Sequence, residues 1–307
     1  MGAGTGDRVT AGYPGGVPDP DLLMAVPNVS EGADPGALDA IGAAFASRPP
    51  ARLVTARHAD PDHHRAVFTL AGPPGPLREA LLAGTRATLA HVDLRTPRGL
   101  HPHVGAIDVI PIVHLDDARR AAATAEALAL AEAIGRDLAL PVLLYGALAG
   151  GRTRAELRRG GLPALTARLA AGELAPDFGP AAPHATAGAV LVTARPPLVA
   201  FNVELAPPAT VDDARRIAAL IREGGPEGLP GLRAIGLALD ARAGVAQVSC
   251  NVEDHRAVPL AAVVAAVARH APVAEAELVG LAPRAAFDGF PPDVPLRNRA
   301  TIEDALA

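Results

Sequence analysis

Apolar residues follow two spacings along this chain, alternate positions in short runs and helical spacing in longer ones, and the succession of spacings occurs twice. In the first half, the pattern predicts a strand at 22–30, a helix at about 35–47, extended runs at 52–59 and 64–71, a helix at about 76–91, a strand at 106–113, a helix at 116–138 and a buried strand at 141–145. Local chemistry supports these boundaries, because Asp34 is a suitable helix cap and Asp60-Pro61-Asp62 suits the turn between the two extended runs.

The second half repeats the order. It predicts a strand at 198–205, a helix at 210–223, a hairpin formed by 232–240 and 245–252, a helix at 259–270 and a strand at 276–281. Thr210 can begin the first of these helices and Gly224 can end it. Both halves therefore read β-α-β-β-α-β, which is the split βαβ order.

This order predicts an α/β (α+β) fold of two similar lobes, each an open mixed sheet with helices on one face. An open sheet must bury its second face, which favours two lobes that face each other across a cleft. The length of 307 residues suits about two domains. We expect a disordered leader at 1–20, an N-terminal lobe at 21–188, a C-terminal lobe at 189–290 and a tail at 291–307. The Gly- and Pro-rich ends of 150–188 predict a connector.

Composition excludes several classes of function. The net charge of −5 argues against nucleic-acid binding. All 28 basic residues are arginine, which excludes a lysine Schiff base and a P-loop lysine. The single cysteine, Cys250, forms no internal disulfide and reads as a buried apolar residue, as expected in a reducing compartment. No apolar run is long enough for a membrane span and no signal peptide is evident, so a cytoplasmic location is expected.

The segment with the most chemistry surrounds His101-Pro102-His103, which precedes a strand that contains Asp108. The pKa of histidine lies near neutrality, so His101 is a candidate proton-transfer group. Strict alternation places Asp108 on the same face as Ala106, and a buried carboxylate needs a partner such as His101 or an arginine. Ordinary polar loop residues are the alternative interpretation.

Two further clusters stand out. The run from His58 to Arg65 combines histidines and carboxylates at a hairpin turn; with His103 and His114 it offers enough metal ligands, but the spacing is poor for zinc and no metal is expected. The loop Pro176–Pro180 carries an aromatic ring and follows Arg154, Arg158 and Arg159 in the chain. It is suited to stacking on a planar ring, or it is simply a domain linker.

Seven segments, in this order and spacing, resemble the glutamate formimidoyltransferase (formiminotransferase) family in its single-module type, without a cyclodeaminase domain. The segments lie between Val26 and Pro283: 26–32 (VPNVSEG), 64–72 (HRAVFTLAG), 101–111 (HPHVGAIDVIP), 141–146 (PVLLYG), 176–180 (PDFGP), 247–251 (QVSCN) and 278–283 (LVGLAP).

The resemblance implies a homodimer of two-lobed subunits with a folate-binding cleft. The family moves a formimidoyl group from N-formimidoyl-L-glutamate to N5 of tetrahydrofolate, its co-substrate, in histidine catabolism and one-carbon metabolism. Its catalytic histidine maps to His101. Its folate-binding loop maps to Pro176, Asp177, Phe178, Gly179 and Pro180, with His184 just after.

This chemistry suits the residues. One nitrogen loses a proton while another gains one, which a single histidine can do in turn. Asp108 would orient that imidazole, in analogy with a catalytic triad. Because both substrates carry carboxylates, we expect arginines in the cleft. The predicted substrate-binding residues are Asn28, Arg65, His103, Gly105, Tyr145, Arg154, Arg195 and Asn202.

The chain also departs from the family pattern. His103 replaces the usual arginine of a His-Pro-Arg motif, and Gly160-Gly161 interrupts a segment that usually carries acidic residues and a tyrosine. These departures leave three alternatives open: a folate-dependent formyl or one-carbon transferase with another donor, a folate-binding protein without turnover, and a His/Asp metal hydrolase.

Overall fold

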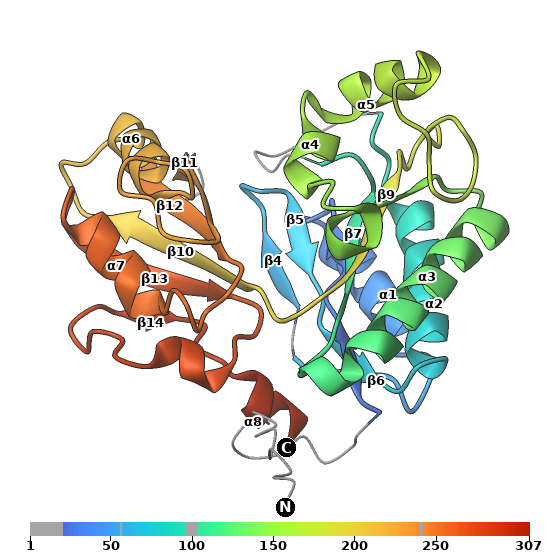
Figure 1. The fold of residues 1–307 in the computed structure, drawn as a ribbon, viewed down its shortest axis with the longest axis horizontal. Helices are drawn as coiled ribbons and strands as arrows, with labels where there is room; N and C mark the ends of the chain where they lie inside the picture. Colours follow the sequence, from blue (N-terminus) through green and yellow to red (C-terminus); the bar gives the residue numbers. More distant parts are fainter. Residues whose placement is uncertain (1–20, 56, 96–102, 240–241, 243) are drawn as a thin grey trace, which may run out of the picture.

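The computed structural model describes residues 21–55, 57–95, 103–239, 242 and 244–307. Two lobes stand side by side, the N-lobe (21–195) and the C-lobe (199–297), joined by the linker 196–198 (Figure 1). The predicted α/β architecture of two sheet-and-helix lobes is confirmed.

The N-lobe is built on a nine-stranded sheet. Its strands are β1 (Leu23–Ala25), β2 (Asn28–Val29), β3 (Arg52–Leu53), β4 (His58–Asp60), β5 (Arg65–Val67), β6 (Leu70–Gly72), β7 (Ile107–Val113), β8 (Val142–Leu144) and β9 (Val190–Arg195). The order is β3-β6-β1-β7-β2-β5-β4, with β9 parallel to both β7 and β8. The consecutive pairs β1 and β2, β3 and β4, and β5 and β6 therefore each form one longer strand that is interrupted in the middle.

Three helices cover one face of this sheet: α1 (Pro35–Phe45), α2 (Pro76–His91) and α3 (Arg120–Asp137) (Figure 1). Asp34 caps α1 by accepting hydrogen bonds from the backbone of Gly36 and Ala37, as predicted. The buried Glu126 of α3 accepts from the backbone of Gly75 and Arg78 at the start of α2. The main apolar core lies between these helices and the sheet.

The C-lobe has the predicted β-α-β-β-α-β order. It consists of β10 (Val199–Leu205), α6 (Val211–Ile221), β11 (Leu232–Leu239), β12 (Val245–Val252), α7 (Leu260–Ala268) and β13 (Val273–Val279), followed by β14 (Leu296–Arg297). Its strand order is β11-β12-β10-β13-β14. Alternate residues such as Val199, Phe201 and Val203 point to a core under α6 and α7, which leaves Ala200 and Asn202 on the opposite face.

The two lobes share one topology. In the N-lobe, β3–β4, β5–β6, β1–β2 and β7 take the places that β11, β12, β10 and β13 take in the C-lobe. The repeat of element order that the sequence predicts in the two halves is therefore visible in the strand order.

The structure departs from the sequence-based organisation at two places. The expected connector contains α4 (Arg154–Arg158) and α5 (Gly161–Ala170), which cover part of the N-lobe's second face through Leu157, Leu165 and Leu169. Residues 190–195, which the expected boundary at 189 assigns to the C-lobe, form β9, and this strand pairs in the N-lobe sheet. A buried apolar run shows that a strand exists, but not which sheet it joins.

The expected tail, 291–307, carries β14 and a final helix, α8 (Ile302–Leu306). Among the described residues, every helix is too short or too polar to span a bilayer. The expected leader at 1–20 lies outside the described residues.

Candidate functional site

Two adjoining cavities lie between the facing sheets. The first, called here the arginine cavity, is lined by Arg65, Arg154, Arg158 and Arg195 together with Asn28, Asn251 and apolar residues of both lobes. The second, the amide cavity, is lined by Asn202, Ser249 and Asn251 of the C-lobe and by His63 and Arg158 of the N-lobe, among others. Because Arg65, Arg158 and Asn251 line both, the two cavities form one continuous cleft.

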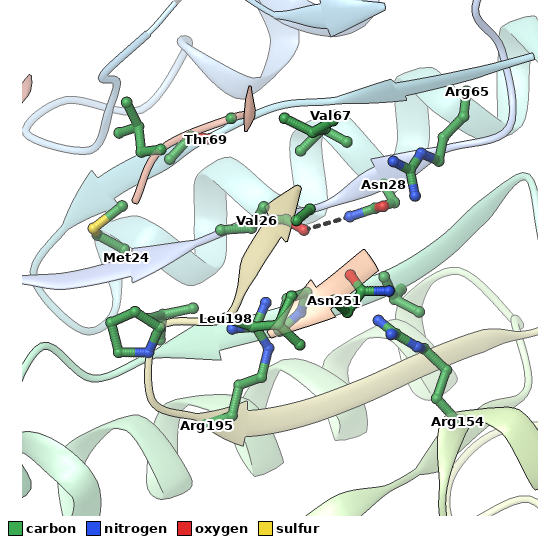
Figure 2. A pocket seen from close by; sticks show the side chains of 18 of the residues that line it. Met24, Val26, Asn28, Arg65, Val67, Thr69, Arg154, Arg195, Leu198 and Asn251 are labelled. Atoms are coloured by element: carbon green, nitrogen blue, oxygen red, sulfur yellow. Dashed lines mark hydrogen bonds between the residues drawn. The ribbon is translucent and has the colours of Figure 1, made fainter. Parts of the chain in front are cut away.

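Four guanidinium groups reach the arginine cavity from three elements. Arg65 comes from β5, Arg195 from β9, and Arg154 and Arg158 from α4. Figure 2 shows Arg65 and Asn28 on one side of the cavity, with Arg154, Arg195 and Asn251 across from them. The segment that was expected to be a connector therefore supplies two of the four cationic side chains.

Burial makes these positive charges costly. Desolvation, together with the neighbouring positive charges of Arg158 and Arg154, lowers the pKa of Arg65 to about 10. Desolvation also lowers the pKa of Arg195 to about 10. Arginine remains charged at neutral pH, so the like charges oppose one another. An anionic ligand would relieve this repulsion.

Asp108 is the buried carboxylate among these cations. It is 2% exposed, forms an ion pair with Arg158, and accepts a hydrogen bond from the backbone of Val104 at 2.8 Å. The expectation from strict alternation was wrong here. In the ladder with β2, Asn28 pairs with Val109 and Val29 with Ile107, so Asp108 is the extra residue of a β-bulge. The bulge turns Asp108 away from the face of Ala106 and toward α4.

Two donors at this site lack an acceptor. Arg158 Nε and Arg195 Nε are buried and have no hydrogen-bond partner among the described residues. The buried Tyr145 side chain interacts with the Arg195 guanidinium, and this interaction partly offsets the lowering of the Arg195 pKa by burial. Buried polar atoms are almost always paired in folded proteins, so such donors at a cavity wall suit a bound oxygen ligand.

The amide cavity presents neutral polar groups. Asn202 on β10 donates to Glu277 Oε2 on β13 at 3.1 Å, and Asn298 donates to the other oxygen of the same carboxylate at 3.3 Å. Beside them, Glu204 pairs with Arg242 and Arg297, which also bind Glu275. The cavity volume of about 400 Å³ lies within the range of small-molecule sites.

The histidine-rich turn from His58 to Arg65 lies at the cleft. Hydrogen bonds from His63 outweigh the effect of burial and lower the pKa of Asp60 to about 2. His58 Nε2 lies 4.0 Å from Glu277 of the other lobe, so this turn contacts the C-lobe. In the ranges that the structure describes, no three His, Cys, Asp or Glu residues are placed to hold a metal ion.

The structure brings together some of the predicted site residues and not others. Asn28, Arg65, Arg154 and Arg195 line the arginine cavity, and Asn202 lines the amide cavity. His101 lies outside the described residues. His103 and Gly105 precede Asp108 by five and three residues and are absent from the linings of the two cavities. Gly105 is needed there because a Cβ would overlap the carbonyl oxygen of Ala189.

The predicted folate loop lies elsewhere in the N-lobe. The cavity linings do not include Pro176, Asp177, Phe178, Gly179, Pro180 or His184. Asp177 accepts from the backbone of Leu144 at 2.7 Å and pairs with Arg152. Phe178 packs against the main core, and Gly179 packs against Gly135 and Leu140. In this structure, the loop secures β8 and the end of α3.

The predicted substrate-binding residues did not include Arg158, Ser249 or Asn251, although Arg158 was noted as part of an arginine cluster. Arg154 and Arg158 are four residues apart, the spacing that places two side chains on one helix face. Ser249 and Asn251 are polar residues that alternate with Val248 and Cys250 along β12, which is the pattern of a strand with one wet face.

Comparison with known proteins identifies the architecture. A model of the formiminotransferase domain, N-terminal subdomain, matches residues 22–195, and a formiminotransferase domain model matches 200–288. Formimidoyltransferase-cyclodeaminase of Sus scrofa is 36% identical over 275 residues, which cover 85% of this chain and 50% of that protein. The chain thus spans about half the length of that relative.

Two shorter relatives match over most of their length. Glutamate formimidoyltransferase of Streptococcus pyogenes serotype M1 is 35% identical over 234 residues, which are 75% of this chain and 77% of that protein. The protein of the same name from Thermoplasma acidophilum is 31% identical over 277 residues, covering 87% and 89%. With its two lobes matched in order, this chain belongs to the formiminotransferase domain family.

Proposed function

We propose that this chain transfers a formimidoyl group from N-formimidoyl-L-glutamate to N5 of tetrahydrofolate. The observation that carries the proposal is the arginine cavity, which lies between the two lobes of a formiminotransferase fold and gathers four guanidinium groups, of which Arg158 is ion-paired with Asp108. Relatives named glutamate formimidoyltransferase support the reaction class. From the family resemblance we also propose a homodimer, which sedimentation would test.

The donor carries two carboxylates, which match this charge. In our proposal Arg195 and Arg154 bind one carboxylate and Arg65 the other, through the forked geometry that suits guanidinium–carboxylate pairs. The unpartnered Nε of Arg195 would then find its acceptor. Asn28, whose amide donates to Val26 O at 2.9 Å, has its amide oxygen left to accept from the ligand's nitrogen.

Tetrahydrofolate, as the second substrate, would enter from the amide cavity. This cavity has the volume for a bicyclic ring, and Asn202, Ser249 and Asn251 supply donors and acceptors to a heterocycle edge. The resemblance separately assigns Pro176–Pro180 and His184 to folate, and that assignment stays a prediction. Asn251 lines both cavities, so the reacting atoms of the two substrates would meet beside it.

The reaction moves one proton off N5 and another onto the departing nitrogen, and one acid/base group can carry out both transfers. As N5 attacks the formimidoyl carbon, a proton leaves N5, and His101 would accept it. The same imidazole would then protonate the departing nitrogen as its bond to carbon breaks, which releases glutamate. Asp108, held between Arg158 and the backbone of Val104, would orient this histidine or stabilise its cation.

The decisive test is a turnover assay with tetrahydrofolate and N-formimidoyl-L-glutamate that follows the folate product. We expect His101→Ala to abolish transfer while tetrahydrofolate binding, measured by calorimetry, is retained. We expect His103→Arg to keep or raise affinity for the donor. Near wild-type kcat in His101→Ala would exclude His101 as the acid/base group, and no turnover by the wild-type protein would exclude the donor or the reaction.

A further inference from the structure

The final helix, α8, connects the two lobes. It lies beyond residue 288, where the family match ends, so the formiminotransferase models do not include it. Figure 1 shows α8 at the lower ends of the two lobes, after the chain has left β14. The apolar side of this short helix contacts the N-lobe, and its polar side contacts the C-lobe.

The apolar side of α8 belongs to the N-lobe core. Ile302 is 3% and Leu306 5% exposed, and both pack against residues of the N-lobe sheet. Their neighbours include Met24 of β1, Ala71 of β6 and Val113 of β7. These strands lie at the centre of the N-lobe sheet and line the floor of the cleft.

The polar side of α8 is bound to the C-lobe. The backbone of Ile302 donates to Ala282 O at 2.9 Å, which continues from β13. The Glu303 carboxylate accepts from the backbone N–H of Arg284 at 2.9 Å. The Arg284 side chain forms an ion pair with Asp304 at 2.6 Å. The helix is therefore fixed to the C-lobe while its apolar side chains are buried in the N-lobe.

The position of α8 bears directly on the cleft. Ile302 lines the arginine cavity, as do Pro197 and Leu198 of the linker between the lobes. We infer that α8 is a clasp that sets the spacing of the two lobes, so that Ile302 and Leu306 are positioning residues for the cleft. Leu306 does not line the cavity, so any effect of its truncation on substrates must pass through the placement of the lobes.

The first test measures the spacing itself, without reference to activity. Spin labels at Glu132→Cys on α3 and Ala219→Cys on α6 occupy exposed positions on opposite lobes, and the buried Cys250 is inaccessible to the label. We expect a single narrow distance distribution in the parent protein. Adding Leu306→Ala should broaden or shift it, because the clasp loses one of its two buried side chains.

A matched control separates spacing from stability. Leu260→Ala removes a fully buried leucine from α7, on the side of the C-lobe sheet away from the cleft. This variant should lower the Tm at least as much as Leu306→Ala while leaving the distance distribution unchanged. An unchanged distribution in Leu306→Ala, or the same change in both variants, would overturn the inference.

The second test is kinetic and rests on the proposed function. Well below the Tm, Leu306→Ala should raise KM for both substrates at least about fivefold with kcat within about twofold of wild type, because fewer molecules hold the competent spacing. Leu260→Ala should leave both constants unchanged. Unaltered KM in Leu306→Ala refutes the clasp. If the wild-type protein shows no turnover, only the proposed function fails, and the spin-label result still decides the clasp.

Discussion

The N-lobe and the C-lobe share a strand order but present different chemistry to the cleft. The N-lobe face is apolar around Val67 and Val109, with cations at its edge, whereas the C-lobe face carries Asn202, Glu277 and Gln247. In both lobes the opposite face is apolar and covered by helices. The comparison teaches that topology places a face at the cleft, while alternate residues along its strands decide which groups it binds.

The largest expected difference concerns the buried carboxylates of the two lobes. Asp108→Ala leaves Arg158, 10% exposed, without its counter-charge and beside two other arginines, so the free energy of unfolding should fall by about 3–5 kcal/mol. Glu204→Ala should cost about 1–2 kcal/mol, because Arg242 and Arg297 are more than one-third exposed and keep Glu275. Urea titrations check both values, and equal losses would contradict the contrast.

The next contrast concerns arginines on the two walls of the cleft. Arg195→Ala removes a buried N-lobe cation, so kcat/KM for the donor should fall about 10- to 100-fold. Arg233→Ala on the C-lobe side removes a half-exposed guanidinium that already pairs with Glu223 and Glu253, so the loss should stay below about threefold. Steady-state kinetics with varied donor measure both, and a larger loss in Arg233→Ala would reverse the assignment of the walls.

A third contrast concerns close helix packing. Gly236 lies on β11 where α6 crosses it, and a Cβ there would overlap the backbone nitrogen of Arg215. Gly236→Ala should lower the free energy of unfolding by about 1–3 kcal/mol, because backbone atoms must move. Gly84→Ala in the N-lobe meets the ring of Phe45 instead and should cost less if the ring can shift. Thermal melts of the two variants rank them.

The smallest effect is a pH dependence shared by the lobes. Burial lowers the pKa of His114 in the N-lobe and of His255 in the C-lobe below 6.5. Each therefore binds its proton less readily in the folded protein than in the unfolded chain, so its contribution is complete above pH 6.5 and declines as the pH falls from there toward the lower pKa of the folded state. The decline is at most about 1.4 kcal/mol per pH unit for each histidine. Urea titrations at pH 7.5 and 5.5 should show it, and His114→Gln or His255→Gln should reduce it.

The sequence predicts regular elements well where local signals agree. The helix at 76–91 and the strand at 245–252 match α2 and β12 residue for residue, because helical or alternate spacing and a nearby turn point to the same boundaries. The helices α4 and α5 escaped prediction because Gly160, Gly161 and Pro163 resemble a loop.

The site is less predictable because it depends on pairing between distant segments. Arginines suited to carboxylates could be nominated by type, and Arg65, Arg154 and Arg195 do meet in one cavity. No spacing rule brings β5, α4 and β9 together. Asn251 becomes a cavity residue only because the N-lobe faces it. The direction of the Asp108 side chain depends on a register shift that alternation along the sequence cannot reveal.

Because of that register shift, the direction in which the Asp108 side chain points depends on the number of residues in β7. Ile107 and Ile110 both enter the main core, three positions apart instead of two, because Asp108 is the extra residue between them. Deleting Asp108 would restore even alternation with Ile107 and Ile110 still on the core side, but it would remove the counter-charge of Arg158. One extra residue in β7 thus lets Asp108 face α4 while the isoleucines on either side of it face the core. Among related sequences, changes in the length of this segment should therefore be rarer than changes in its side chains.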